Sequence, residues 1–189
     1  HSLGGNVAAL YAGVRPARIR RLVNLEGFGM SPTKPEQAPQ RYALWLDELH
    51  QASGFRPYPG FASLADRLQK SNPRLSRPRA EFLARHWGRE TEDGRVLLRG
   101  DPAHKIVNPV LYRYEETRAC WARVSAPVLW VDAAQSEALK RIGLTEEQYA
   151  ERRASFADLR HVTVKDAGHM LHHDQPEHVA RLIEDFLLA

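Results

Sequence analysis

The sequence of 189 residues lacks several features that mark specialised classes of protein. It has a single cysteine, Cys120, so no disulfide can form within the chain, which favours a reducing compartment such as the cytoplasm. No apolar run approaches the roughly 18 residues that a membrane-spanning helix needs. The chain also has no internal repeat and no low-complexity tract. These absences exclude a disulfide scaffold, a membrane span and a repeat architecture.

The charge balance excludes a dedicated nucleic-acid binder. The net charge is +4, but the 27 basic residues are interspersed with 23 acidic ones. The densest basic cluster comprises Arg15, Arg18, Arg20 and Arg21, which follow a predicted helix. Cations are favoured at the end of a helix, so this cluster has a local explanation. With 43% hydrophobic and 26% charged residues, the composition is that of an ordinary globular domain.

Two blocks of alternating helix and strand patterns enclose a middle of different composition. The first block, 1–30, predicts a helix at 4–14 and a buried strand within 21–28. The second block, 119–189, starts within a predicted helix at 112–123. It predicts, in order, a strand at 126–134, a helix at 145–155, a strand and loop at 159–169 and a helix at 175–188. Strands that alternate with helices predict an α/β fold with a parallel sheet.

The middle region, 31–118, is rich in proline. Prolines at positions 32, 35, 39, 57, 59, 73, 78, 102 and 109 separate short segments. These segments predict helices at 36–53, 61–70 and 77–87 and an extended piece at 96–100. The first helix is expected to bury one face, which would carry Tyr42, Leu44, Trp45, Leu46 and Leu49. A helical insertion of this kind is typical of a lid over an active site, although a separate helical layer fits equally well.

The first candidate for chemistry is Ser2, in the stretch HSLGG at 1–5. A serine hydroxyl is a poor nucleophile near neutral pH and needs a base to accept its proton. A tight turn from strand to helix exposes such a hydroxyl and directs backbone N–H groups at a developing oxyanion. The other interpretation is a serine that only caps the following helix.

The second candidate is His169, in KDAGHMLHHDQPE at 165–177. It follows a predicted strand and precedes a helix, so its imidazole is expected at the carboxyl edge of the sheet. Asp174 and Glu177 have the spacing of a capping box at the start of that helix. His169, His172 and His173 could also form a metal site. No second cluster of ligands at suitable spacing supports that alternative, so we predict no metal.

Together these motifs resemble the α/β-hydrolase fold family, from its nucleophile elbow onward. HSLGG is similar to the end of the elbow G-H-S-x-G-G, and 166–187 is similar to the catalytic-histidine loop and final helix. APVLWV at 126–131 is similar to the strand before the usual acid loop. The resemblance implies the C-terminal part of that fold, with parallel strands, flanking helices and an inserted helical lid. It also implies that the N-terminal half of the sheet is missing from this sequence, so that the strand edge at 21–26 could self-associate.

The triad acid departs from the commonest pattern of this family. Where the resemblance places an aspartate after the strand at 126–131, the sequence VDAAQSE carries Ser136. The family's other acid position corresponds to Glu26, in VNLEGFG. A carboxylate there would accept the imidazole N–H and stabilise the imidazolium. Glu26 is the favoured acid, and Glu137 and Asp132 are the alternatives.

The resemblance implies a serine hydrolase of the lid-bearing esterase kind. Ser2, Glu26 and His169 are its candidate catalytic residues, and the Leu3 backbone N–H is the candidate oxyanion donor. A serine at the elbow, in place of the aspartate of epoxide hydrolases and haloalkane dehalogenases, implies an acyl-serine intermediate. We expect no cofactor and a small, apolar acyl substrate. The candidate substrate contacts are His1, Phe28 and Met170.

Two further expectations complete this interpretation. The chain is expected to be inactive alone, because the resemblance places a second oxyanion donor in a loop before the elbow. A non-catalytic member of the fold, which binds a ligand or a partner, is the main alternative to a hydrolase. A metal-dependent hydrolase is a third hypothesis, and sensitivity to chelators would distinguish it.

Overall fold

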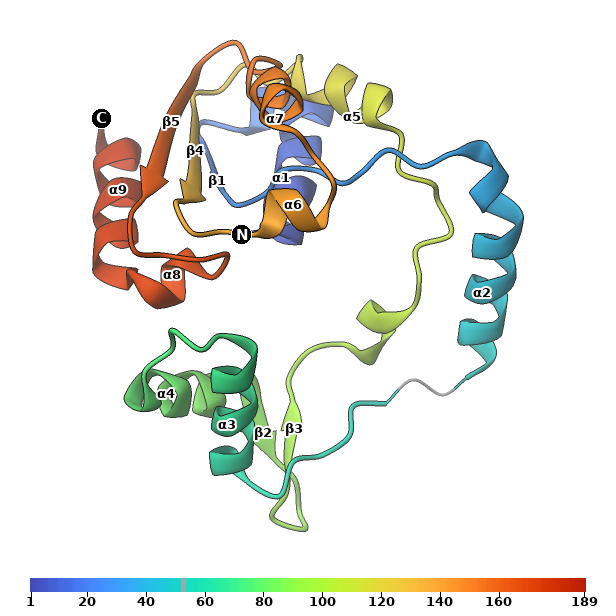
Figure 1. Cartoon of the computed structure of the whole chain (residues 1–189), viewed down its shortest axis with the longest axis vertical. Coiled ribbons are helices and arrows are strands. Elements are labelled where there is room, and N and C mark those ends of the chain that lie inside the picture. Colours follow the sequence, from blue (N-terminus) through green and yellow to red (C-terminus); the bar gives the residue numbers. More distant parts are fainter. Residues whose placement is uncertain (52–53) are drawn as a thin grey trace. The chain divides into compact units, whose positions relative to one another are not determined.

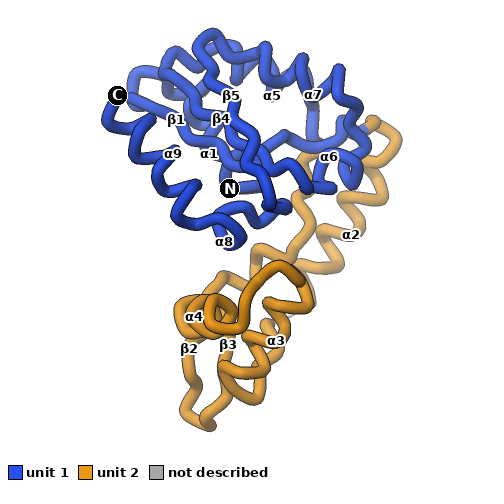
Figure 2. The backbone as a smooth tube through the Cα atoms, turned by 60° about the vertical axis from the view of Figure 1, so that its left-hand side comes forward, with its two compact units in different colours: residues 1–33, 112–189 blue, residues 34–111 orange. Residues whose placement is uncertain are grey.

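The computed structural model describes residues 1–51 and 54–189, which form two compact units (Figure 2). Unit 1 comprises residues 1–33 and 112–189, and unit 2 comprises residues 34–111. Ala52 and Ser53, the end of the helix predicted at 36–53, lie outside the described residues. Among the residues that are described, no helix is long and apolar enough to cross a bilayer.

Unit 1 is built on a three-stranded parallel sheet (Figure 1). The strands are β1 (Leu22–Leu25), β4 (Val128–Ala133) and β5 (Leu159–Val164), in the order β1-β4-β5. Every residue of β4 is buried except Asp132, which is partly buried. This burial on both faces explains the continuous apolar run of its sequence. The predicted parallel sheet is therefore confirmed.

Helices cover both faces of this sheet (Figure 1). One face packs against α1 (Leu3–Val14), α5 (Tyr114–Trp121) and α7 (Glu146–Arg153). The other packs against α8 (Leu171–Asp174) and α9 (Pro176–Leu188). The 3₁₀ turn η1 (Pro16–Arg18) leads from α1 to β1, and the short helix α6 (Ala138–Arg141) follows β4.

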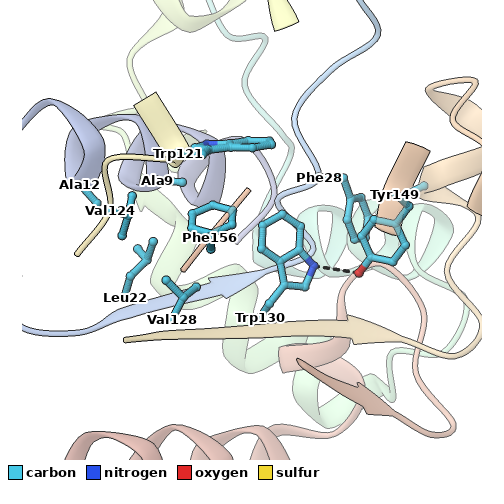
Figure 3. Packing of buried hydrophobic residues seen from close by; sticks show 11 residues of the cluster. Ala9, Ala12, Leu22, Phe28, Trp121, Val124, Val128, Trp130, Tyr149 and Phe156 are labelled. Carbon is cyan, nitrogen blue, oxygen red and sulfur yellow. Dashed lines mark hydrogen bonds between the residues drawn. The ribbon is translucent and has the colours of Figure 1, made fainter. Parts of the chain in front are cut away.

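Aromatic side chains fill the core between β4 and the helices α1, α5 and α7 (Figure 3). Trp130 of β4 packs edge-on against Trp121 of α5, with ring centroids 6.2 Å apart. Its indole nitrogen donates a 2.8 Å hydrogen bond to the hydroxyl of Tyr149. Phe28 packs edge-on against Tyr149 at 5.3 Å. This cluster anchors the loop after β1, which carries Phe28, to the centre of the unit.

The approach of α1 to α5 leaves no room for a side chain at Gly13. A Cβ atom built there would lie 1.9 Å from the carbonyl oxygen of Cys120. We expect Gly13→Ala to lower the free energy of unfolding by about 1–3 kcal/mol or more, because the two helices must separate. Gly4→Ala is the matched control on the same helix, since nothing lies within 4 Å of its added Cβ. Denaturant titration of the two variants checks this, and equal midpoints would contradict it.

Unit 2 contains helices and a two-stranded antiparallel sheet. Its elements are η2 (Pro35–Gln37), α2 (Ala38–His50), α3 (Phe61–Ser71), α4 (Arg77–Trp87), β2 (Gly88–Glu90), β3 (Val96–Leu98) and η3 (Pro102–Lys105). The core of the unit joins α3, α4 and β3 through Leu64, Ala84 and Val96, which are at most 1% exposed. The helices and the extended piece predicted here are therefore present, and β2 is an additional strand.

Two local predictions were wrong. The helix α2 has no buried residue, although its apolar pattern predicted a buried face. The periodicity indicates a helix, but burial also needs a packing partner over the apolar face, which periodicity alone does not predict. The helix start predicted at Asp174 is also wrong, because the N-cap position of α9 is Gln175, whose side chain makes no cap hydrogen bond. The carboxylate of Asp174 accepts a 2.8 Å hydrogen bond from the backbone N–H of Gly168.

Candidate active site

Ser2 lies at a sharp turn before α1, close to the end of β1. Its backbone N–H donates a 2.8 Å hydrogen bond to the carbonyl of Leu25. Its backbone has φ 50° and ψ −121°, a conformation that L-residues rarely adopt. Such strain costs on the order of 1–3 kcal/mol and persists only where the surrounding structure enforces it. The turn thus presents the hydroxyl at the start of the helix, as a nucleophile elbow does.

The turn after β1 places Glu26 beside Ser2. The buried Asn24 donates from its amide to the carbonyl of Gly27 at 2.9 Å and accepts from the Gly27 N–H at 3.0 Å. These two bonds close a turn in which Glu26 has a positive φ of 55°. A Cβ atom at Gly5 or Gly27 would lie within 2.3 Å of the Asn24 amide oxygen. Both glycines are therefore needed for the close approach of α1 to this turn.

The carboxylate of Glu26 is buried, and both of its oxygens accept hydrogen bonds. The residue is 2% exposed. Its Oε1 accepts a 2.7 Å hydrogen bond from the backbone N–H of Ala133. Its Oε2 accepts hydrogen bonds from the hydroxyl of Ser136 and from Nδ1 of His169, the latter at 2.9 Å. A buried carboxylate needs such donors, because an unsatisfied charge in the interior is strongly unfavourable.

His169 connects Glu26 to Ser2. Its Nδ1 lies 2.9 Å from Glu26 Oε2, and its Nε2 lies 3.0 Å from the Oγ of Ser2. When the ring carries its proton on Nδ1 and donates it to the carboxylate, Nε2 is free to accept the proton of the serine. The three side chains thus form a continuous hydrogen-bonded relay from carboxylate to hydroxyl.

The imidazole of His169 lies in a group of histidine rings. The His1 ring is 4.8 Å from that of His169 and 4.4 Å from that of His172, and its Nε2 lies 2.7 Å from the His169 carbonyl oxygen. Burial lowers the pKa of His172 to about 4, with a smaller contribution from the adjacent His173. Burial also lowers the pKa of His173. At neutral pH His172 is therefore uncharged and does not oppose an imidazolium at His169.

A pocket of about 290 Å³ opens beside this relay. Ser2, Glu26 and His169 line it, together with Asn6, Phe28, Gly29, Ala138, Arg141 and Ile142. Its size lies at the lower end of the range for small-molecule sites, about 300–1,000 Å³. A small acyl group could therefore bind next to the serine hydroxyl.

The other predicted site residues lie in different surroundings. Leu3 follows Ser2 as the first residue of α1, with a half-exposed side chain. Phe28 is buried in the core and also lines the pocket. His1 and Met170 are half-buried and are not among the described residues that line the pocket.

The alternative acids lie away from the imidazole. Asp132 accepts hydrogen bonds from the hydroxyl of Tyr149 and from Nε2 of His161, both at 2.7 Å. Glu137 pairs with Lys140 at 3.1 Å, and both side chains are exposed. Of the three carboxylates considered, the structure thus places only Glu26 in contact with the candidate base.

The predicted alternative of a metal site has no geometric counterpart. Across residues 1–51 and 54–189, no group of three or more His, Cys, Asp or Glu side chains is arranged to hold a metal ion. The ring nitrogens of His169 face Glu26 and Ser2. His172 and His173 lie against each other, with ring centroids 4.1 Å apart.

Two residues that shape the site were not predicted from the sequence. Ser136 stands where the family pattern predicts an acid, yet its hydroxyl contacts the acid itself. Asn24 lies within an apolar strand and closes the turn that carries Glu26. A buried polar residue within an apolar strand is itself a signal, because its hydrogen bonds must be satisfied locally.

Comparisons with known proteins identify the family and the fold of the chain. One curated relative, a serine hydrolase-like protein of Danio rerio, is 27% identical over 195 residues. The match covers 99% of this chain and 59% of the relative, so the chain spans about three fifths of that protein's length.

Solved structures show the same fold. The thioesterase domain from the curacin biosynthetic pathway superimposes with a TM-score of 0.77 at 23% identity, over 97% of this chain and 64% of that one. An esterase of M. tuberculosis superimposes with a TM-score of 0.69 at 20% identity, over 98% of this chain and 60% of that one.

A sequence profile of the alpha/beta hydrolase fold matches residues 1–176, which is most of the chain. The profile covers the elbow, β1, β4, β5 and the loop that carries His169. The chain therefore belongs to the α/β-hydrolase fold family.

Proposed function

We propose that this chain carries the catalytic relay of a serine hydrolase that cleaves an ester, a thioester or a related acyl bond. The single observation that carries the proposal is the imidazole of His169, which lies within hydrogen-bonding distance of both Ser2 and Glu26. A fold alone does not imply activity, since many folds host unrelated functions. A nucleophile, a base and a buried acid in one relay have a specific chemical use.

In the proposed reaction, Ser2 Oγ attacks the acyl carbon while His169 Nε2 takes the hydroxyl proton. Glu26 holds the ring through Nδ1 and stabilises the imidazolium that forms. The imidazolium then gives its proton to the leaving alcohol or thiol, and an acyl-serine remains. Water attacks this ester with His169 again as the base, which releases the acid and restores the serine. The Leu3 N–H at the start of α1 is the proposed donor to the oxyanion.

The proposed substrate has a small, largely apolar acyl group. Phe28, Ala138 and Ile142 give the pocket beside Ser2 an apolar part, and its volume is about 290 Å³. The names of two similar structures, a thioesterase domain and an esterase, support acyl transfer to water as the reaction class. Short-chain p-nitrophenyl esters are suitable first substrates.

A fluorophosphonate probe tests this proposal, applied to a longer protein in which a segment before residue 1 supplies the second oxyanion donor, because the chain alone is expected to be inactive. Kinetic measurements on the variants use the same protein. We expect one adduct, located by mass spectrometry on Ser2, because His169 accepts the serine proton as the P–O bond forms and fluoride leaves. Ser155→Ala is the control, since that hydroxyl donates to the carbonyl of Glu151 outside the relay, and it should label at the wild-type rate. A folded protein that gives no adduct on Ser2 would instead support a non-catalytic member of the fold.

A further inference from the structure

The acid of the relay is held by groups outside the three proposed catalytic side chains. Oε1 of Glu26 is fixed by the backbone N–H of Ala133, within the central strand. Oε2 is shared by two donors, the hydroxyl of Ser136 and the imidazole of His169. The orientation of the carboxylate toward the ring therefore depends on a hydroxyl that takes no direct part in the proposed reaction.

The hydroxyl of Ser136 has its own fixed geometry. Its Oγ accepts a 3.2 Å hydrogen bond from the backbone N–H of Ala138, the first residue of α6. The backbone N–H of Ser136 donates to the carbonyl of Ala133 at 3.1 Å. Because Oγ accepts from α6, its proton is available for Glu26. Ser136 is therefore held from both sides, with its donor directed at the carboxylate.

The same hydroxyl joins the acid to the wall of the pocket. Ala138, Arg141 and Ile142 line the pocket beside Ser2. The chain of bonds runs from the Ala138 N–H to Ser136 Oγ and then to Glu26 Oε2, where His169 also donates. The wall that would contact a substrate and the acid that orients the base are thus one hydrogen-bonded assembly.

We propose that Ser136 is a positioning residue that holds Glu26 on His169 and connects α6 to the relay. This inference rests on the proposed function for its effect on turnover. The hydrogen bond itself and its effect on the ring exist whether or not the chain is an enzyme. Hydrogen bonds to charged groups are stronger than those between neutral groups, so the loss of this donor should be measurable.

Ser136→Ala and Ser136→Thr are the decisive pair of variants. We expect Ser136→Ala to lower kcat for p-nitrophenyl butyrate by about 10-fold, because the carboxylate loses a charge-assisted donor. KM should change by less than about 3-fold, since a group that acts on the base affects the transition state rather than ground-state binding. Ser136→Thr keeps the hydroxyl and should retain most of the wild-type kcat. Equal losses in both variants would overturn the proposal.

A double-mutant cycle separates positioning from a purely structural role. A serine that only capped α6 would lower kcat by the same factor with or without the carboxylate at position 26. A serine that acts through Glu26 should have no further effect in the Glu26→Gln background. Additive losses in Ser136→Ala/Glu26→Gln would therefore contradict the proposal.

The ring of His169 provides a readout that does not need activity. Proton NMR should show a downfield Nδ1–H signal in the wild-type protein, absent in His169→Ala. Ser136→Ala should shift or broaden this signal, and Ser155→Ala should leave it unchanged. An unchanged signal in Ser136→Ala would overturn the inference. A shifted signal in a protein that forms no adduct on Ser2 would leave the inference standing while the proposed function fails.

Discussion

Replacing Ser2 or His169 by alanine is expected to lower kcat for ester hydrolysis by on the order of 10⁴–10⁶-fold each. Removing Ser2 removes the atom that carries the acyl group in the proposed reaction. Removing His169 leaves the hydroxyl without its proposed proton acceptor, the Nε2 atom 3.0 Å away. Each variant should also lose labelling by the fluorophosphonate probe, since that reaction uses the same nucleophile and base.

The double variant provides the sharper result. The effects of residues that act as one unit are strongly non-additive. The kcat of Ser2→Ala/His169→Ala should therefore lie within about 10-fold of the kcat of the less active single variant. Losses that multiply would mean that the two side chains act independently, which would contradict the relay. Circular dichroism should stay close to wild type in all three proteins, because neither side chain belongs to the buried core.

The parts of the fold that could be predicted from sequence are those that local pattern determines. The apolar run of β4 predicts a strand buried on both faces, and every residue of it except Asp132 is buried. The relay could also be proposed, because Ser2 precedes a helix, Glu26 ends a strand and His169 follows another. In a parallel sheet, the carboxyl ends of the strands lie along one edge, which brings these residues together.

Features that depend on contacts between distant residues could not be predicted. Ser136 and Glu26 are separated by 110 positions, and no spacing in the sequence indicates that one donates to the other. The burial of α2 could not be predicted for the same reason. Its apolar positions indicate a helix but do not show whether other residues cover them. The spacing of Asp174 does not indicate that its carboxylate accepts a hydrogen bond from the Gly168 N–H and so holds the loop that carries His169.

Sites where two backbone segments approach each other closely could not be predicted from the sequence either. The need for glycine at Gly5 in α1 and at Gly27 in the turn after β1 becomes visible only through the Asn24 amide between them. From its buried position in β1, the Asn24 side chain forms hydrogen bonds with both the N–H and the carbonyl of Gly27 in the turn that follows. Polar groups of this kind are retained in cores where every donor and acceptor finds a partner.

A substitution of the favoured acid, Glu26, is also expected to have a large effect on kcat. Glu26→Gln is expected to lower kcat by about 10⁴-fold while the geometry of the site is largely kept. The Ala133 N–H requires an acceptor, so the amide oxygen of the introduced glutamine should take the place of Oε1. The NH₂ group of that amide then faces Nδ1 of His169 and forces the ring proton onto Nε2. In that tautomer the ring cannot accept a proton from Ser2.

Asp132→Asn and Glu137→Gln are the matched controls for this prediction. Each removes one negative charge from an alternative acid that the structure pairs elsewhere, with Tyr149 and His161 or with Lys140. We expect both controls to keep kcat within about 3-fold of wild type, because exposed or remote pairs contribute little to the relay. Steady-state kinetics on the three variants decides the assignment. A loss in Asp132→Asn or Glu137→Gln that equals or exceeds the loss in Glu26→Gln would transfer the role of the acid to that residue.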